Sequence, residues 1–152
     1  MSVQTTYTAT IPKAYAGLVA DNNPYRIITK ICETAAGIPY GRKVSRGTSD
    51  DQAVIGGATG HLGIACRVHN QENALGTESQ TYNETDAMAI LQEGSIYLYV
   101  TTTGSPGDAL YSVDADGTIG AGAPGAGQTA IAGATLEETL AAAGLALCRF
   151  TA

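Results

Sequence analysis

Apolar and β-branched residues occur along this chain in short runs, each bounded by glycine, proline, asparagine or aspartate. Runs of this length are typical of strands, and the residues between them are those that tight turns require. We therefore predict an all-β chain of about eight to ten short segments. The runs from which this follows are residues 26–34, 42–46, 52–55, 61–68, 87–91, 95–101, 110–113 and 118–119.

The pattern also indicates how strands connect in two regions, residues 87–101 and 135–150. Residues 87–91 and 95–101 flank Glu93-Gly94, which predicts a hairpin. Thr135-Leu-Glu-Glu138 has the form of a capping box and Gly144 that of a helix stop, so 135–143 can be a short helix. The competing interpretation is a strand at 135–140, a turn near Gly144 and a final strand at 145–150. Both remain open on pattern alone.

The first 25 residues contain the two chain breakers Pro12 and Pro24 and show little periodicity. This favours an extended arm over a helix. We expect an arm at 1–25 followed by a single β domain at 26–152, folded as a sandwich, jelly roll or small barrel. The simpler alternative is that the arm forms the first strand of the core.

Composition narrows the classes of function. The chain has 152 residues, of which 14% are charged, with 19 Gly, no Trp, one Phe and eight Tyr. Tyrosine has an apolar ring and a polar tip, so it suits a contact surface. A net charge of −6 argues against nucleic acid as a partner. No signal peptide or apolar run of about 18 residues is present, so we expect a soluble protein made in a cytoplasm, with no membrane partner.

Candidate metal ligands are few. Cys32, Cys66 and Cys148 each lie in an apolar run, and we interpret them as small buried hydrophobic residues. His61, Cys66 and His69 are close in sequence, but on a strand 61 and 69 point one way and 66 the other. No ligand set results, so we expect folding without metal or cofactor.

Two glycine-containing segments match part of the sequence pattern of a ligand-binding loop but lack other features that such loops require. Residues 120–125 read Gly-x-Gly-x-x-Gly, but Pro124 lies inside the motif and no βαβ pattern surrounds it. Asp114-x-Asp116-Gly117 begins like a calcium loop, yet its twelfth position is Gly125 where a glutamate is needed. We interpret 114–117 as a hairpin turn and 120–127 as a flexible loop.

A succession of individually weak motifs resembles one known family, the structural cement proteins of tailed bacteriophages. The similarity covers nearly the whole chain in order and spacing. It is carried by Ala16-Gly-Leu-Val-Ala-Asp21, Gly37-Ile-Pro-Tyr-Gly-Arg-Lys-Val44, Gly63-Ile-Ala-Cys-Arg-Val68, the segment from Tyr82 to Tyr97, and Gly144-Leu-Ala-Leu-Cys-Arg-Phe150.

The resemblance implies a β-rich, jelly-roll-like domain on the outer face of a phage shell, assembled in the host cytoplasm. It implies the major capsid protein as partner, association with copies of itself and no catalytic residue. It also favours the strand-turn-strand interpretation of 135–150. Because the resemblance begins in the arm, we expect capsid contacts from residues there, namely the aromatic Tyr7 and Tyr15, the apolar Leu18 and Val19, and the acidic Asp21.

Two other functions fit the composition. A carbohydrate- or receptor-binding β module of a virion surface would show an exposed aromatic platform and bind glycans. A small β-barrel hydrolase would need two carboxylates that converge in the fold.

Overall fold

The computed structural model describes residues 14–20, 25–67 and 81–151. Every regular element in these ranges is a strand, which confirms the all-β prediction. The strands are β1 (Arg26–Cys32), β2 (Ile38–Pro39), β3 (Lys43–Arg46), β4 (Gln52–Ile55), β5 (His61–Ala65), β6 (Thr81–Tyr82), β7 (Ala87–Val100), β8 (Ala109–Val113), β9 (Ile119–Ala121), β10 (Gln128–Leu136) and β11 (Gly144–Phe150).

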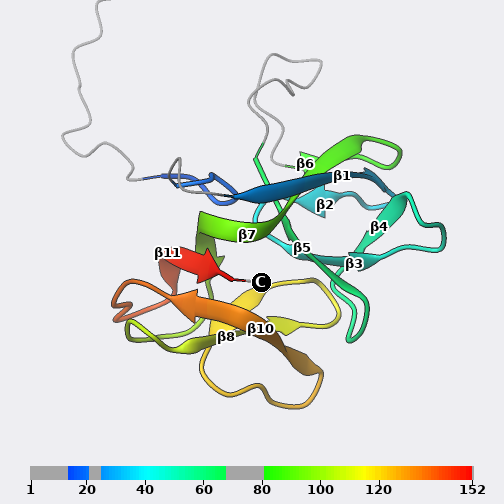
Figure 1. Ribbon diagram of the computed structural model, residues 1–152. Helices are drawn as coiled ribbons and strands as arrows, with labels where there is room; N and C mark the ends of the chain where they lie inside the picture. Colours follow the sequence, from blue (N-terminus) through cyan, green and yellow to red (C-terminus); the bar gives the residue numbers. More distant parts are fainter. Residues whose placement is uncertain (1–13, 21–24, 68–80, 152) are drawn as a thin grey trace, which may run out of the picture.

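The long strand β7 belongs to two closed rings of strands. In one ring, β1, β4, β3 and β5 follow one another, and both β5 and β1 pair with β7. In the other, β11, β10, β8 and β9 follow one another, and both β11 and β9 pair with β7. Figure 1 shows β7 between the two groups. Of the architectures expected for short strands, the small barrel is therefore the observed one.

β7 corrects the prediction of a hairpin at Glu93-Gly94. The chain continues as one strand through Gly94, whose φ of 127° lies outside the range that other residues readily adopt. The residues before Gly94 pair with β1 and β5, and those from Gly94 onward pair with β11. Gly94 therefore marks the change of partners inside a strand and not a turn between two strands.

The fold has two hydrophobic cores: one lies within the β1 ring, and the other is built mainly by the β11 ring but also includes Ile64 of β5 and Leu91 of β7. Along β7, Met88 and Ile90 contribute to the core of the β1 ring, whereas Ile96, Leu98 and Val100 contribute to the core of the β11 ring. Cys32, Cys66 and Cys148 are all buried with free thiols, as their apolar neighbours predicted. Cys66 lies in the core and His61 is exposed; His69 lies outside the described residues.

The carboxyl-terminal region is strand-turn-strand, so the helix considered for 135–143 is wrong. β10 ends at Leu136, β11 begins at Gly144, and Leu140 pairs with Gly104 between them. The final strand lies where the sequence predicted it, but the strand expected at 135–140 continues only to Leu136, and Gly144 begins the last strand. The strand at residues 128–134 was not predicted, because its small Ala, Gly and Thr residues carry little apolar signal. Residues 114–117 do form the turn of the β8–β9 hairpin.

Candidate contact surface

The described part of the arm, residues 14–20, lies along the second half of β7. Its backbone runs antiparallel to the strand: Gly17 N donates to Tyr97 O at 2.8 Å, and Tyr97 N donates to Leu18 O at 2.9 Å. Ala20 N donates to Ser95 O at 2.8 Å. The arm is also joined to the end of β5, because Arg67 N donates to Gly17 O at 2.7 Å. This segment is thus held to the barrel by its main chain.

Gly17 fits a place that a larger residue cannot take without strain. Its φ is 80°, and a β-carbon there would lie 3.0 Å from the backbone nitrogens of Arg67 and Gly41 and from the β-carbon of Tyr40. The arm therefore approaches the turn between β2 and β3 closely. The sequence Ala16-Gly17 places its small side chains where β5, β7 and this turn meet.

Tyr15 stands outward from this junction over a guanidinium group. The Cζ atom of Arg67 lies 4.8 Å from the centre of the Tyr15 ring and 5.8 Å from that of Tyr40. Both distances are within the range of cation–π attraction. Arg67 and Tyr40 are buried, whereas Tyr15 is 52% exposed. An aromatic ring is thus fixed from beneath with half of its surface open to a partner.

Beside the arm is a pocket of about 290 Å³. It opens where both rings and the arm meet, and Tyr99, which is 55% exposed, is among its walls. Tyr99 faces outward because it alternates along β7 with buried Leu98 and Val100. The residues around the pocket are Ala16, Pro39, Tyr40, Gly41, Arg42, Tyr99, Thr101, Thr118 and Ile119.

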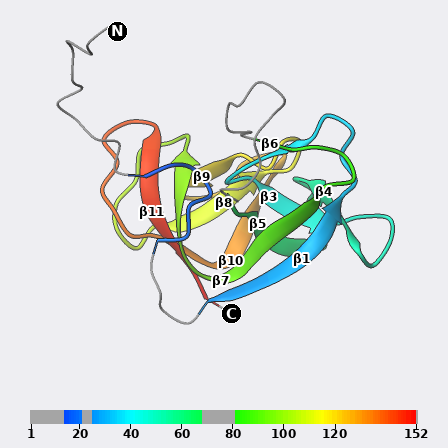
Figure 2. The same cartoon turned by 90° about the horizontal axis from the view of Figure 1, so that it is seen from above.

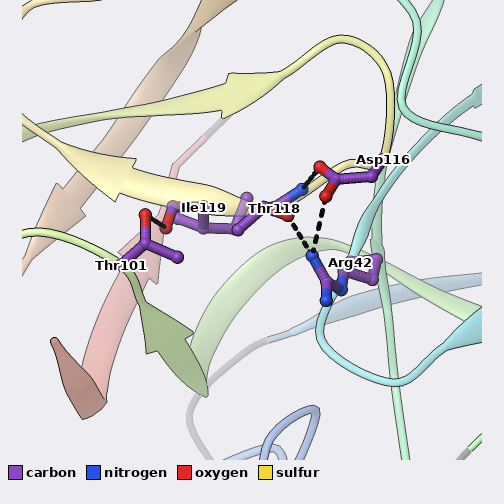
Figure 3. Close-up of polar contacts among 5 residues, drawn as sticks. All are labelled: Arg42, Thr101, Asp116, Thr118 and Ile119. Atoms are coloured by element: carbon purple, nitrogen blue, oxygen red, sulfur yellow. Dashed lines mark hydrogen bonds and ion pairs between the residues drawn. The ribbon is translucent and has the colours of Figure 1, made fainter.

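A polar cluster closes one side of the pocket (Figure 3). Arg42 Nη1 donates to Thr118 Oγ1 and lies 3.7 Å from Asp116 Oδ2. Thr118 N donates to Asp116 Oδ1 at 2.9 Å, which fixes the carboxylate in the β8–β9 turn. Nearby, Thr101 Oγ1 donates to Ile119 O at 3.1 Å and joins β7 to β9. This cluster links the β2–β3 turn of one ring to the hairpin of the other.

The cluster also sets the charge of Asp116. Partial desolvation acts to raise its pKa, but the two hydrogen bonds from Thr118 and the nearby Arg42 outweigh it, so the pKa lies below the ordinary value. Asp116 is therefore negatively charged near neutral pH. The surface offers a paired charge beside exposed tyrosines and a pocket.

The five arm residues singled out from the sequence have different positions. Tyr15 is exposed, and Leu18 and Val19 are half-buried, with Val19 packed against the core of the β11 ring. Tyr7 and Asp21 lie outside the described residues. Sequence reasoning missed Tyr40, Arg42, Tyr99 and Thr118, which come from separate segments. For Tyr99, the alternation of apolar residues along 95–101 is a signal from which an outward-facing aromatic residue could have been predicted.

We call the surface formed by Tyr15, Arg42, Tyr99 and Thr118 around this pocket the arm-side surface. Within 14–20, 25–67 and 81–151, no three His, Cys, Asp or Glu side chains come together as metal ligands. No helix in the same ranges is long and apolar enough to cross a membrane. The chemistry available at this surface is aromatic contact, hydrogen bonding and one ion pair, which are means of recognition.

Comparison with known proteins identifies relatives. A family model described as structural cement protein (E217 gp24/Pam3 gp6) matches residues 3–151. No curated protein matches the sequence. A chain in the solved structure "The capsid of Myoviridae Phage XM1" is similar in fold, with a TM-score of 0.74, 22% identity, and 99% of this chain and 98% of that chain covered.

A second solved structure is less similar. It is "The crystal structure of head fiber gp8.5 N base in bacteriophage phi29", with a TM-score of 0.47 and 12% identity. The match covers 84% of this chain and 95% of that chain.

Proposed function

The chain belongs to the phage structural cement protein family, and from this we propose that it binds the outer face of the major capsid protein shell and stabilises contacts between capsomers. Membership makes it a structural protein of the phage capsid, associated with the shell in the virion. The observation that carries the proposal is the family match over residues 3–151. The outer face, the major capsid protein as partner and self-association are the parts we add.

We propose the arm-side surface, with Leu18 and Val19 beside it, as the capsid contact. Tyr15 and Tyr99 are about half exposed, and tyrosine is enriched at protein interfaces. Burying the exposed half of each ring contributes roughly 0.8–1.5 kcal/mol before the costs of association. A contact of this size is weak alone. Several copies linked to one another can still bind strongly, because later contacts become intramolecular.

The proposal is tested by adding the protein to capsids that lack it and then heating them. We expect bound protein to raise the temperature at which the shells open, because a ligand of the intact shell stabilises it by mass action. A form without the first 21 residues, shown to be folded, tests the arm. If the intact protein does not bind capsids, the cement proposal is wrong; if the shortened form protects equally, only the arm's contribution is wrong.

Point variants test the surface itself. Replacing Tyr15 and Tyr99 together (Tyr15→Ala/Tyr99→Ala) is expected to weaken capsid binding by about tenfold to a hundredfold. The matched control is Asp50→Ala, an exposed residue in the turn between β3 and β4, which is expected to bind like the parent. Equal affinity of the double variant and the control would place the contact elsewhere.

The pocket gives one specific reason to consider carbohydrate binding. Its walls combine Tyr40 and Tyr99 with the hydroxyls of Thr101 and Thr118, which is the mixture of rings and hydrogen-bonding groups that sugars use. Glycan-array binding that Tyr99→Ala abolishes, together with failure to bind capsids, would favour this function. We also propose that the protein is not an enzyme: none of the described residues that line the pocket carries a carboxylate, and the nearby Asp116 is a single carboxylate held by Arg42 and Thr118, whereas a hydrolase needs two that converge.

A further inference from the structure

β1 carries an apolar face on the outside of its ring. Alternate residues of a strand share a face, so Tyr25, Ile27, Thr29 and Ile31 lie together. All four are exposed, with Tyr25 at 53%, Ile27 at 38% and Ile31 at 37%. The opposite face carries Cys32 into the core and packs Ile28 against it. An outward strand face in water normally carries polar residues, so this face is suited to a partner.

The same stretch of β1 has an open edge in the described structure. β1 pairs with β7 over Arg26–Ile31, but with β4 only at Ile31 and Cys32. Ile31 N donates to Asp51 O, on the side away from β7. By alternation, the N–H and C=O groups of Ile27 and Thr29 also point away from β7. No described strand lies there to bind them, and Figure 2 shows β1 along one flank of the molecule.

The chain contains a segment with the pattern of a strand for such an edge. Residues 2–11 read Ser-Val-Gln-Thr-Thr-Tyr-Thr-Ala-Thr-Ile, followed by Pro12. The odd positions are Val, Thr, Tyr, Ala and Ile, and the even positions are Ser, Gln, Thr, Thr and Thr. The arm as a whole shows little periodicity, but within these ten residues apolar and polar positions alternate with only Thr5 as an exception. The segment is rich in β-branched residues, carries no charge and is followed by a strand-ending proline.

We propose that residues 2–11 of one copy add as a strand to the open edge of β1 in a second copy. Main-chain hydrogen bonds to Ile27 and Thr29 supply affinity, as in strand addition generally. The apolar odd positions of the segment lie beside Tyr25, Ile27 and Ile31 and fix the register, because a slip of one residue would turn them to the other face. The proposal deepens the self-association included in the proposed function and assigns Tyr7 to a second copy and not to the shell.

The direction of the arm favours a second copy over the same chain. Gly17 pairs with Tyr97 and Ala20 with Ser95, so toward its beginning the arm runs along β7 toward Val100. β1 pairs with the other half of β7, from Ala87 to Glu93. The arm therefore leaves residue 14 heading away from its own β1. To pair with its own β1, the segment at 2–11 would have to reverse this direction, whereas pairing with a second copy requires no reversal.

Two full-length variants remove the two halves of this contact. N–H groups of consecutive strand residues point to opposite edges of the strand. Thr5→Pro/Thr6→Pro removes two consecutive N–H donors, so pairing is disrupted whether the odd-numbered or the even-numbered residues donate to β1. Thr29→Pro removes an N–H that no described residue uses and leaves the β1–β7 pairing in place. Controls are Thr5→Val/Thr6→Val, which keeps β-branched residues, and Tyr99→Lys, which changes an exposed ring on the arm-side surface.

Sedimentation at micromolar concentrations measures the result. The parent and both controls are expected at a multiple of 15.5 kDa, and each proline variant at 15.5 kDa with an unchanged circular dichroism spectrum. Mixing the two proline variants is expected to restore association, because one still donates a segment and the other still offers an edge. As a second acceptor-side change, Ile27→Lys is expected to dissociate the assembly without altering the core.

Several results would overturn the proposal. A parent protein of 15.5 kDa would do so, as would proline variants that still associate or a mixture that stays monomeric. A monomeric parent in which Thr5→Pro/Thr6→Pro causes association would mean that the segment covers its own edge. Capsid binding is a separate measurement: if Tyr99→Lys associates normally but no variant or parent binds capsids, the cement proposal fails while this one stands.

Discussion

At the scale of single residues, tyrosine has two roles that composition alone does not separate. Tyr82 is fully buried, and its hydroxyl donates to Cys66 O at 2.7 Å and accepts from Ala89 N at 3.3 Å. Its ring meets Tyr40 edge to face, with centres 5.0 Å apart. A chain without tryptophan thus fills one core with a tyrosine whose polar tip binds backbone groups. Tyr15 and Tyr99, by contrast, are about half exposed, which suits the contact role that we propose for them.

The buried thiols predict how stability depends on pH. Burial raises the pKa of Cys66 and of Cys148 to about 12, from 9.0 for a free thiol. Between these values the unfolded chain loses protons that the folded chain keeps. Stability contributed by the neutral thiols is therefore complete below pH 9 and is lost as pH rises toward 12. Each thiol contributes a slope of up to about 1.4 kcal/mol per pH unit.

Urea unfolding at a series of alkaline pH values measures this slope. Cys148→Ala is expected to lower stability at every pH, because it leaves a small cavity, and to flatten the slope above pH 9 by the share of one thiol. Burial also raises the pKa of Tyr82 and lowers that of Lys43, but both groups are common to the two proteins and cancel in the comparison. Parallel profiles for the two proteins would show that Cys148 ionises normally in the folded state.

At the scale of elements, local signals predicted most strands but not which ones continue. Short apolar runs located β1, β3, β4, β5, β8 and β11 closely, because strand residues there alternate with true turns. Glu93-Gly94 carries the same local signal as a turn. Pairing of β7 with β1, β5 and β11 on its two halves overrides that signal. Such partners come from distant segments, so no window along the sequence contains the deciding information.

The arm is an element whose attachment depends on Gly17. An alanine at its φ of 80°, 3.0 Å from the nitrogens of Arg67 and Gly41, is strained and crowded by backbone. We expect Gly17→Ala to cost about 1–3 kcal/mol and to loosen the arm from β7. Hydrogen exchange should then be faster at the amides of Tyr97 and Arg67, which donate to the arm.

Gly122→Ala is the control for this prediction. Its φ is 107°, also unfavourable to alanine, but no heavy atom lies within 4 Å of the added carbon. It is expected to share the backbone strain and to leave the exchange of Tyr97 and Arg67 unchanged. Faster exchange at those two amides in both variants would mean that the effect is general destabilisation and not release of the arm.

At the scale of the whole molecule, the candidate site was harder to predict than the fold. The sequence pointed to Tyr15 as a contact residue, and it is exposed. The pocket beside Tyr15 is lined by Arg42, Tyr99 and Thr118, which are far apart along the chain. They meet only because both rings close on β7. Contact surfaces built from single residues of many strands leave no local motif, unlike a metal or nucleotide loop.

The two rings are joined by more than β7. The turn of the β8–β9 hairpin rests on β3 and β4, where Lys43 N donates to Gly117 O at 2.9 Å and Gly57 N donates to Asp114 O at 2.8 Å. Lys43 is buried and its ammonium donates to Gly57 O. Desolvation lowers its pKa, and the charge of Asp114 partly opposes that. The β8–β9 turn of one ring therefore provides hydrogen-bond acceptors for backbone groups of the other ring.

This connection predicts that the two cores unfold together. Leu110→Ala in the β11 ring and Met88→Ala in the β1 ring each create a cavity at a fully buried site and are expected to cost about 2–5 kcal/mol. If β7 and the hairpin contacts couple the rings, Leu110→Ala speeds hydrogen exchange in β3 as much as in β11. Each 2 kcal/mol corresponds to about 30-fold. Met88→Ala provides the reciprocal measurement, with the same equality expected. Faster exchange confined to the ring that carries the cavity, in both variants, would show instead that β7 joins two independently unfolding units.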